Sequence, residues 1–119
     1  MARQLLMDAT IQWPLETDKQ PAKVPLSVAL TYTSEMSVEK VYAAPVADEA
    51  VALPMASAAF LLVRAVDNDI DVKLNASANA ITVEADGGFI MIWNPSGTVT
   101  AMTVTIVTSP ATLKVLAFA

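Results

Sequence analysis

Apolar and polar residues alternate at every second position along much of this chain, and this alternation limits the possible folds more than any other feature. Ile70, Val72 and Leu74, for example, are separated by Asp71 and Lys73. Successive side chains of a strand point to opposite faces of a sheet, so a period of two predicts strands with one face against a core. Similar runs, rich in β-branched and aromatic residues, occupy 26–32, 60–66, 80–85, 89–94, 102–106 and 112–119.

Short turn signals separate these runs. The Asp-Gly pair at 86–87 predicts a tight hairpin, and "NPSG" at 94–97 has the proline and glycine positions of a type I turn. About six to eight short antiparallel strands at this spacing predict an all-β, single-domain β-sandwich or jelly-roll-like fold. We expect helix only in short pieces such as 34–40, and we expect the proline-punctuated stretch 44–54 to be a connection between sheets.

The first 25 residues differ in character from the rest. Prolines at positions 14, 21 and 25 each deny a hydrogen-bond donor to a strand ladder. We therefore expect residues 1–25 to form an extended, proline-containing arm and residues 26–119 to form the sandwich domain. Residues 3–13 could be one strand, which pairs either with its own sheet or with a neighbouring molecule.

The chain has an excess of apolar residues. Hydrophobic residues make up 55% of its 119 residues and charged residues only 16%, against about 25% charged in an average soluble domain. A single small core cannot bury them all, so we expect a homo-oligomer, first of all a trimer, or burial against another protein. No apolar run approaches the roughly 20 residues of a membrane-spanning helix, and the opening residues lack the features of a secretion signal. We therefore expect a soluble protein with no membrane partner.

The residues that most enzymes need are missing. The sequence contains neither cysteine nor histidine, which excludes thiol nucleophiles, disulfides, zinc sites of the Cys/His kind and serine–histidine triads. The twelve acidic residues show no spacing that singles out a catalytic pair. The seven basic residues are scattered and the net charge is −5, which is unsuited to binding phosphates. We expect a non-enzymatic protein without cofactor, metal or nucleic acid.

Three aspartates at alternate positions, Asp67, Asp69 and Asp71, raise the question of a calcium site. A helix–loop–helix calcium loop would need glycine at its sixth position and glutamate at its twelfth. Here these positions hold Val72 and Ala78. We therefore interpret the segment as a turn and a strand whose aspartates face solvent while its apolar residues face the core.

The two tryptophans could stack on a sugar ring if they were exposed. Trp93 is in phase with Phe89 and Met91, which predicts a core position. Trp13 precedes Pro14 and is either an anchor that docks on a neighbour or a lid on its own sheet. A carbohydrate- or surface-binding module is therefore an alternative to assembly.

Threonine takes the place of charge on one predicted sheet face. Between Leu74 and Ala119 only Glu84, Asp86 and Lys114 are charged. The threonine face is either a contact surface or the solvent face of an ordinary sandwich. The residues that we predict to bind a partner are Leu5, Leu6, Ile11 and Trp13 in the arm, and Thr103 and Thr105 on this face.

The order of features between residues 60 and 119 carries a family resemblance. An acidic turn, a "DVKLN" strand, an "AITV" strand, a Gly-Gly hairpin, an aromatic strand and a threonine-rich strand follow one another. This half of the chain resembles the C-terminal halves of small all-β structural proteins encoded beside virion genes of tailed bacteriophages. The resemblance implies a virion protein made in the host cytoplasm: a capsid decoration (cement) protein that stabilises neighbouring capsid subunits, or a tail-associated ring or fibre-attachment subunit. An extended arm would then add a strand to a sheet edge of a major capsid or tail protein.

Overall fold

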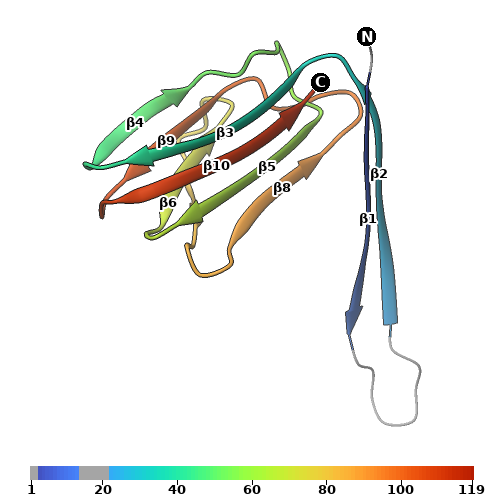
Figure 1. Ribbon diagram of the computed structural model, residues 1–119, viewed down its shortest axis with the longest axis horizontal. Coiled ribbons are helices and arrows are strands. Elements are labelled where there is room, and N and C mark those ends of the chain that lie inside the picture. The colour runs from blue at the N-terminus through green and yellow to red at the C-terminus, as the bar shows by residue number, and fades with distance from the viewer. Residues whose placement is uncertain (1–2, 14–21) are drawn as a thin grey trace. The chain divides into compact units, whose positions relative to one another are not determined.

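The part of the chain that the structure describes consists of ten β-strands and contains no helix, so none that could cross a membrane. The structure is a computed structural model that describes residues 3–13 and 22–119 (Figure 1). It divides into two compact units after Tyr32. The strands are β1 (Arg3–Trp13), β2 (Ala22–Tyr32), β3 (Glu35–Tyr42), β4 (Val46–Val51), β5 (Phe60–Val66), β6 (Ile70–Leu74), β7 (Ile81–Val83), β8 (Phe89–Trp93), β9 (Met102–Ile106) and β10 (Ala111–Phe118).

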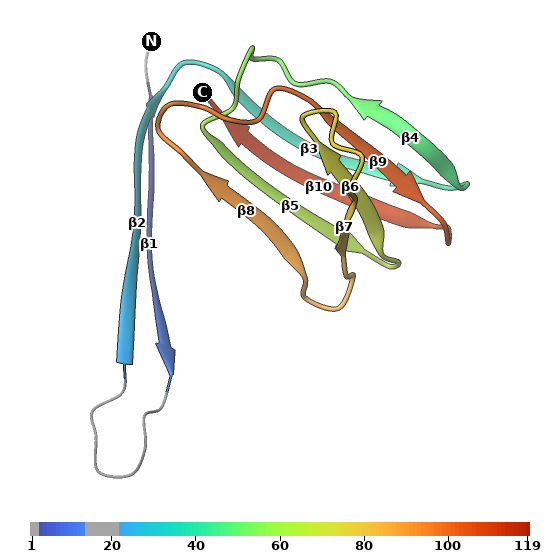
Figure 2. The same cartoon turned by 180° about the vertical axis from the view of Figure 1, so that it is seen from behind.

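Strands β3 to β10 form a sandwich with jelly-roll topology. One sheet has the strand order β3-β10-β5-β8, the other has the order β4-β9-β6-β7, and the pairs are antiparallel. The first strand of the sandwich therefore pairs with the last, the second with the last but one, and so on inward to β6 and β7. An antiparallel ribbon folded over in this way makes two Greek keys, which is the jelly roll. Figures 1 and 2 show the two sheets from opposite sides. The predicted all-β sandwich is confirmed.

The core lies between the two sheets and consists of the alternating residues that the period of two predicted. Val63 on β5 and Leu113 on β10 belong to the same buried cluster as Val72 on β6 and Val104 on β9. Each of these four side chains is almost completely buried. Burying a side chain of this size is worth about 1.5–3 kcal/mol. This cluster therefore supplies most of the free energy that holds the sheets together.

Two predictions about the start of the sandwich were wrong. Residues 34–40, expected as a helical piece, belong to strand β3, because Met36 and Val38 alternate toward the core and the strand pairs with β10 along its whole length. The stretch 44–54, expected as a connection, contains strand β4, which pairs with β9 across a register shift. A β-bulge inserts an extra residue and so interrupts the alternation that marks a strand in the sequence.

The two turn predictions had different outcomes. The turn at 94–97 forms as predicted, since the backbone N–H of Gly97 donates to the carbonyl of Asn94 at 2.9 Å. The tight hairpin expected at 86–87 was wrong, because the flanking strands β7 and β8 lie in different sheets. Gly87 does adopt a positive φ of 88°, so the glycine marks a chain reversal, but the reversal is a crossover between sheets.

The predicted strand at residues 3–13 is confirmed as β1, and its partner is β2 of the same chain. The two strands pair along their whole lengths as an antiparallel hairpin. The boundary of this unit follows Tyr32, whereas the arm was expected to end at residue 25, because β2 continues through Pro25 without a break. A proline is tolerated in a strand that needs no hydrogen bond on its N–H side. The prolines at 14 and 21 lie outside the described residues.

Candidate functional site

The β1–β2 hairpin has one apolar side and one mainly polar side. Directly opposite residues of an antiparallel pair point to the same side. The polar side carries a hydrogen bond from the hydroxyl of Ser27 to Asp8 Oδ1 at 3.2 Å. The other side, which we call the hairpin apolar face, consists of Leu5 with Leu30, Met7 with Val28, Ala9 with Leu26, and Ile11 with Val24.

The predicted anchor residues of the arm divide between the two sides of the hairpin. Leu5 and Ile11 lie on the hairpin apolar face, whereas Leu6 lies on the polar side opposite Ala29. The backbone of Trp13 pairs with Ala22 at the end of β1. Because Ile11 is 53% exposed and its partner Val24 is 41% exposed, this pair presents apolar surface that a binding partner could cover. Sequence reasoning missed the contribution of β2 to this surface.

The sheet β3-β10-β5-β8 has an outward side that we call the outer face. Its residues alternate with the core residues of the same strands and lie in register in four rows. Many of them are hydrophobic, and they include four of the seven aromatic residues of the chain. The rows are Glu35, Phe118, Phe60 and Trp93; Ser37, Leu116, Leu62 and Met91; Glu39, Lys114, Arg64 and Phe89; and Val41, Thr112 and Val66.

The prediction that Trp93 is a core residue was wrong. Trp93 is in phase with Phe89 and Met91 as predicted, but this set lies on the outer face, and Ile90 and Ile92 pack against the core instead. Phe89 is 62% exposed. Both sets on β8 are apolar, so the alternation could not indicate which of them the core would bury.

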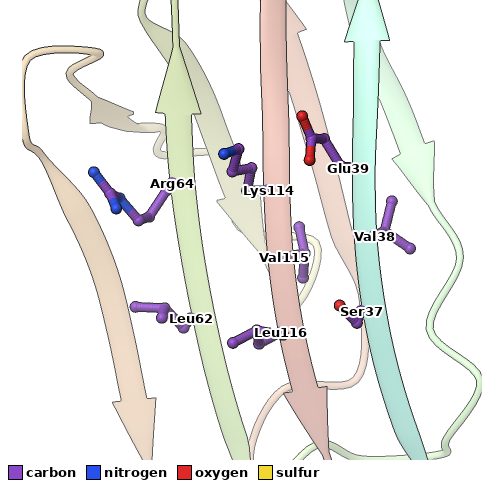
Figure 3. Close-up of a pocket in the computed structure, with 8 residues that line it drawn as sticks. All are labelled: Ser37, Val38, Glu39, Leu62, Arg64, Lys114, Val115 and Leu116. Carbon is purple, nitrogen blue, oxygen red and sulfur yellow. The ribbon is translucent and has the colours of Figure 1, made fainter.

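Three charged side chains cross the outer face in one row. Lys114 on β10 is directly opposite Glu39 on β3 and Arg64 on β5. None of the three takes part in an ion pair with any residue that the structure describes. Together with Leu62 and Leu116 they line a shallow groove of about 450 Å³ (Figure 3). The outer face therefore combines apolar surface with charged side chains that form no ion pair among the described residues.

The outward side of the other sheet is polar, and its groups bind one another. Thr103 and Thr105, the predicted contact residues on β9, share this side and are only partly exposed. The backbone N–H of Asp48 donates to Thr105 Oγ1 at 3.0 Å. Lys73 Nζ lies 2.9 Å from Asp48 Oδ1. On this threonine face, Thr105, Asp48 and Lys73 therefore already have partners within the chain.

The three aspartates that suggested a calcium site line one pocket, but they are not grouped closely enough to hold a metal ion together. Asp69 Oδ1 accepts a hydrogen bond from the backbone N–H of Ala85 at 2.9 Å, and Asp71 Oδ1 accepts one from the hydroxyl of Thr82 at 2.6 Å. Asp67 occupies the turn with a φ of 75°. Over residues 3–13 and 22–119, no three acidic side chains are grouped so that they could hold a metal ion. Asp69 and Asp71 therefore stabilise the pairing of β6 with β7 and the chain that follows β7.

One polar cluster joins the edge strands β3 and β4 of the two sheets. Lys40 Nζ lies 3.7 Å from Glu49 Oε1 and 4.8 Å from the ring centroid of Tyr42. Tyr42 is 4% exposed. Burial first, and then the neighbouring Glu49 carboxylate, raise the pKa of the Tyr42 hydroxyl above its ordinary value of 10.0. A phenol that stays protonated and an ion-paired lysine suit a structural contact between sheets better than acid–base chemistry.

The topology and the surfaces define the class of this protein: an eight-stranded jelly roll that follows an amphipathic β-hairpin. Comparisons with protein-family models, with curated proteins and with solved structures found no match to this chain.

Proposed function

We propose that this chain is a non-enzymatic structural subunit of a tailed-phage virion, in the first place a capsid decoration protein. In this proposal it assembles with itself and docks on a major capsid protein, and the bound copies tie neighbouring capsid subunits together. A tail-associated ring or fibre-attachment subunit would use the same contacts on a tail protein.

The hairpin apolar face is the observation that carries this proposal. Two strands form a single layer, and an isolated hairpin is marginally stable at best. Val28 on this face is buried, but Ile11 and Val24 are 53% and 41% exposed. Strands of this length extend about 36 Å at 3.3 Å per residue. The apolar pairs occupy one side from Leu5 to Ile11 and from Val24 to Leu30. A ribbon of this length and pattern is suited to docking on an apolar surface of another subunit.

The fold and the sequence also support this proposal. Jelly rolls occur in viral capsid domains, lectins and cupins, and a fold alone does not define a function. The resemblance of residues 60–119 to phage structural proteins favours the first of these uses. Docking at several symmetry-related sites of a capsid would strengthen binding through effective concentration, without any large single contact.

Co-sedimentation with particles of the phage that encodes the chain tests this proposal. Heads that lack the protein, and separately purified tails, would be mixed with the full-length chain and with the variant Ile11→Ser/Val24→Ser, which removes one exposed pair of the hairpin apolar face. We expect saturable binding to heads and at least a tenfold loss of affinity in the variant, since each half-buried aliphatic anchor is worth about 1 kcal/mol or more.

The neighbouring pair on the polar side provides a matched control. Gln12 is directly opposite Lys23, so Gln12→Ser/Lys23→Ser changes the hairpin one position away but on the other side, and it should bind as the unchanged chain does. Saturable binding to tails alone would replace the decoration protein by the tail subunit. Failure to bind either particle would refute the proposal.

A carbohydrate-binding module is the second candidate, and the position of Trp93 and Phe89 favours it. Both aromatic rings belong to the outer face rather than to the core, and aromatic faces can stack on sugar rings. Screening the chain against a glycan array tests this function. Binding that is lost in Phe89→Ala would support it, and an array without specific signals would remove it.

A further inference from the structure

Strand β8 lies at one edge of its sheet. The strand order is β3-β10-β5-β8, so β8 pairs with β5 on one side, and no other strand that the structure describes pairs with it on the opposite side. Figures 1 and 2 show this edge strand in orange. An edge strand presents a row of backbone N–H and C=O groups that can bind a further strand. We call this row the β8 edge.

The register of β8 with β5 shows which backbone groups belong to the β8 edge. In an antiparallel pair, the N–H and C=O of every second residue point to the partner strand, and those of the residues between them point away. The N–H of Asn94 donates to the carbonyl of Ala59 at 2.9 Å, in register with the ladder. The residues at odd distances from Asn94 therefore point away from β5, and on β8 these are Phe89, Met91 and Trp93.

The other three edges of the sandwich carry features that keep edge strands from pairing. Natural edge strands avoid pairing through charged side chains, bulges or short length. Strand β4 has a register shift and two acidic residues, β7 is three residues long, and β3 has charged residues at 35, 39 and 40. Strand β8 has the sequence FIMIW, with no charge, no proline and no register shift. Of the four edges, the β8 edge is therefore the one that lacks protection.

A second copy of β8 fits the β8 edge in one antiparallel register. A two-fold axis perpendicular to the sheet at Met91 places Met91 opposite Met91 of the second copy, and Phe89 opposite Trp93 of the second copy. These are the residues whose backbone groups point away from β5. Three N–H groups from each of the two strands therefore make six hydrogen bonds, and each outward C=O accepts one. The contact is isologous, so it closes on itself.

The side chains match in the same register. Directly opposite residues of an antiparallel pair point to the same side. Phe89 therefore lies beside Trp93 of the second copy on the side of the outer face, and Ile90 lies beside Ile92 of the second copy on the core side. Aromatic pairs across strands stabilise a sheet. Phe89 is 62% exposed and the other residues of β8 are partly exposed, so the pairing covers apolar surface that is accessible in a single copy.

We propose that two copies of this chain pair through their β8 edges, antiparallel about Met91, and so join two four-stranded sheets into one of eight strands. This inference rests on the self-assembly part of the proposed function and names the strand that performs it. The contact is two-fold, so it predicts a dimer in place of the trimer expected from the sequence. A pair of five-residue strands buries less than the roughly 1,000 Å² of a stable interface, so the dimer dissociates on dilution.

Absolute mass by light scattering, measured on the full-length chain over a concentration series, tests the pairing. We expect the mass to rise with concentration from 12.6 kDa to twice this value. Met91→Pro removes an N–H that β5 does not use, so it should leave the fold intact and raise the dissociation constant at least tenfold.

The other edge of the same sheet provides the matched control. The N–H of Ala119 donates to the carbonyl of Ser34, so the backbone groups of Ser37, three residues further along β3, point away from β10. Ser37→Pro is therefore the same change on the protected edge, and it should leave the dimer unchanged. Far-UV circular dichroism and thermal unfolding of each variant establish that it is folded.

A pair of charge variants tests the register. Residue 91 of one copy lies directly opposite residue 91 of the other, and like charges in that position repel while opposite charges attract. Met91→Lys and Met91→Glu should therefore each be monomeric alone, and an equimolar mixture of the two should form a dimer. If both variants and their mixture stay monomeric while the unchanged chain pairs, the register about Met91 is wrong.

Three results would overturn the pairing: a monomer at all concentrations, a dimer that Met91→Pro does not weaken, or a dimer that Ser37→Pro weakens equally. A chain that is monomeric, but whose binding to phage heads is lost in Met91→Pro, would assign the β8 edge to a strand of another protein instead. The mass measurements themselves involve no phage particles, so a failure of self-pairing is distinguishable from a failure of capsid binding.

Discussion

Two leucines on strand β10 point to opposite sides of the sheet, and truncating each of them tests which side the core buries. Leu113 is 0% exposed and belongs to the core cluster, whereas Leu116 is 37% exposed on the outer face. Leu113→Ala leaves a cavity between two packed sheets, and such changes cost about 2.7–5 kcal/mol. Leu116→Ala removes a side chain that loses only part of its exposed area on folding, and leaves no closed cavity. From about 1.5–3 kcal/mol for full burial, we expect a cost of about 1 kcal/mol.

The assay is urea unfolding followed by circular dichroism, at protein concentrations low enough for the chain to be monomeric. A domain of this size is stable by about 5–15 kcal/mol, so Leu113→Ala should remove a large fraction of the free energy of unfolding while the slope m stays constant. Equal costs for the two variants, or a larger cost for Leu116→Ala, would refute the assignment of the two faces of this sheet.

Three further predictions concern single residues. The folded-state pKa of Tyr42 lies above the unfolded value of 10.0, so its protonated hydroxyl stabilises the fold at lower pH, and this stability is lost as the pH rises through the raised pKa. Between pH 8 and 11, the melting temperature should therefore fall less steeply in Tyr42→Phe than in the control Tyr32→Phe. Millimolar calcium should shift the melting temperature by less than about 1 °C, and a calcium-dependent rise would revive the metal site. Asp69→Ala removes the acceptor of a backbone hydrogen bond and should lower the free energy of unfolding in urea by about 1 kcal/mol. Gly97→Ala should lower the melting temperature more than Gly87→Ala does. Both glycines have a positive φ, but a Cβ at Gly97 would lie 2.7 Å from Ser57 Oγ, while one at Gly87 would meet open space. Equal melting temperatures of the two variants would contradict this.

The sequence could predict the sides of a strand only where one set of alternating residues is charged. On β6, Asp71 and Lys73 alternate with Ile70 and Val72, and the predicted inward and outward sides are correct. On β8 both sets are apolar, and the choice of Trp93 as a core residue failed. Period two identifies residues that share a side, but the second sheet decides which side is buried.

The hairpin was only half predicted for a related reason. The sequence indicated a strand at 3–13, but the prolines led us to expect an extended arm rather than a second strand at 22–32. A proline interrupts a ladder only on its N–H side, and Pro25 lies in a hairpin with one free edge on each strand. The signal that could have found the pairing is the matched length of the two alternating runs, 3–13 and 22–32, on either side of a polar, proline-containing connection.

The partner-binding residues could be predicted as a class but not as a surface. Leu5 and Ile11 share the hairpin apolar face, while Leu6, adjacent in the sequence, lies on the other side. The outer face was missed because its residues come from four strands that are far apart in the sequence. Only the register of the sheet brings Glu39, Lys114 and Arg64 into one row.

Hydrogen–deuterium exchange of the chain, free and bound to phage heads, tests the central claim most directly. A sheet of only two strands opens readily, because each strand has hydrogen-bonded neighbours on one edge alone, so its amides should exchange fast in the free chain. If the hairpin apolar face docks on the capsid, the amides of 3–13 and 22–32 will exchange at least tenfold more slowly in the bound chain. Unchanged exchange in both strands of a chain that is bound to heads would contradict docking through the hairpin.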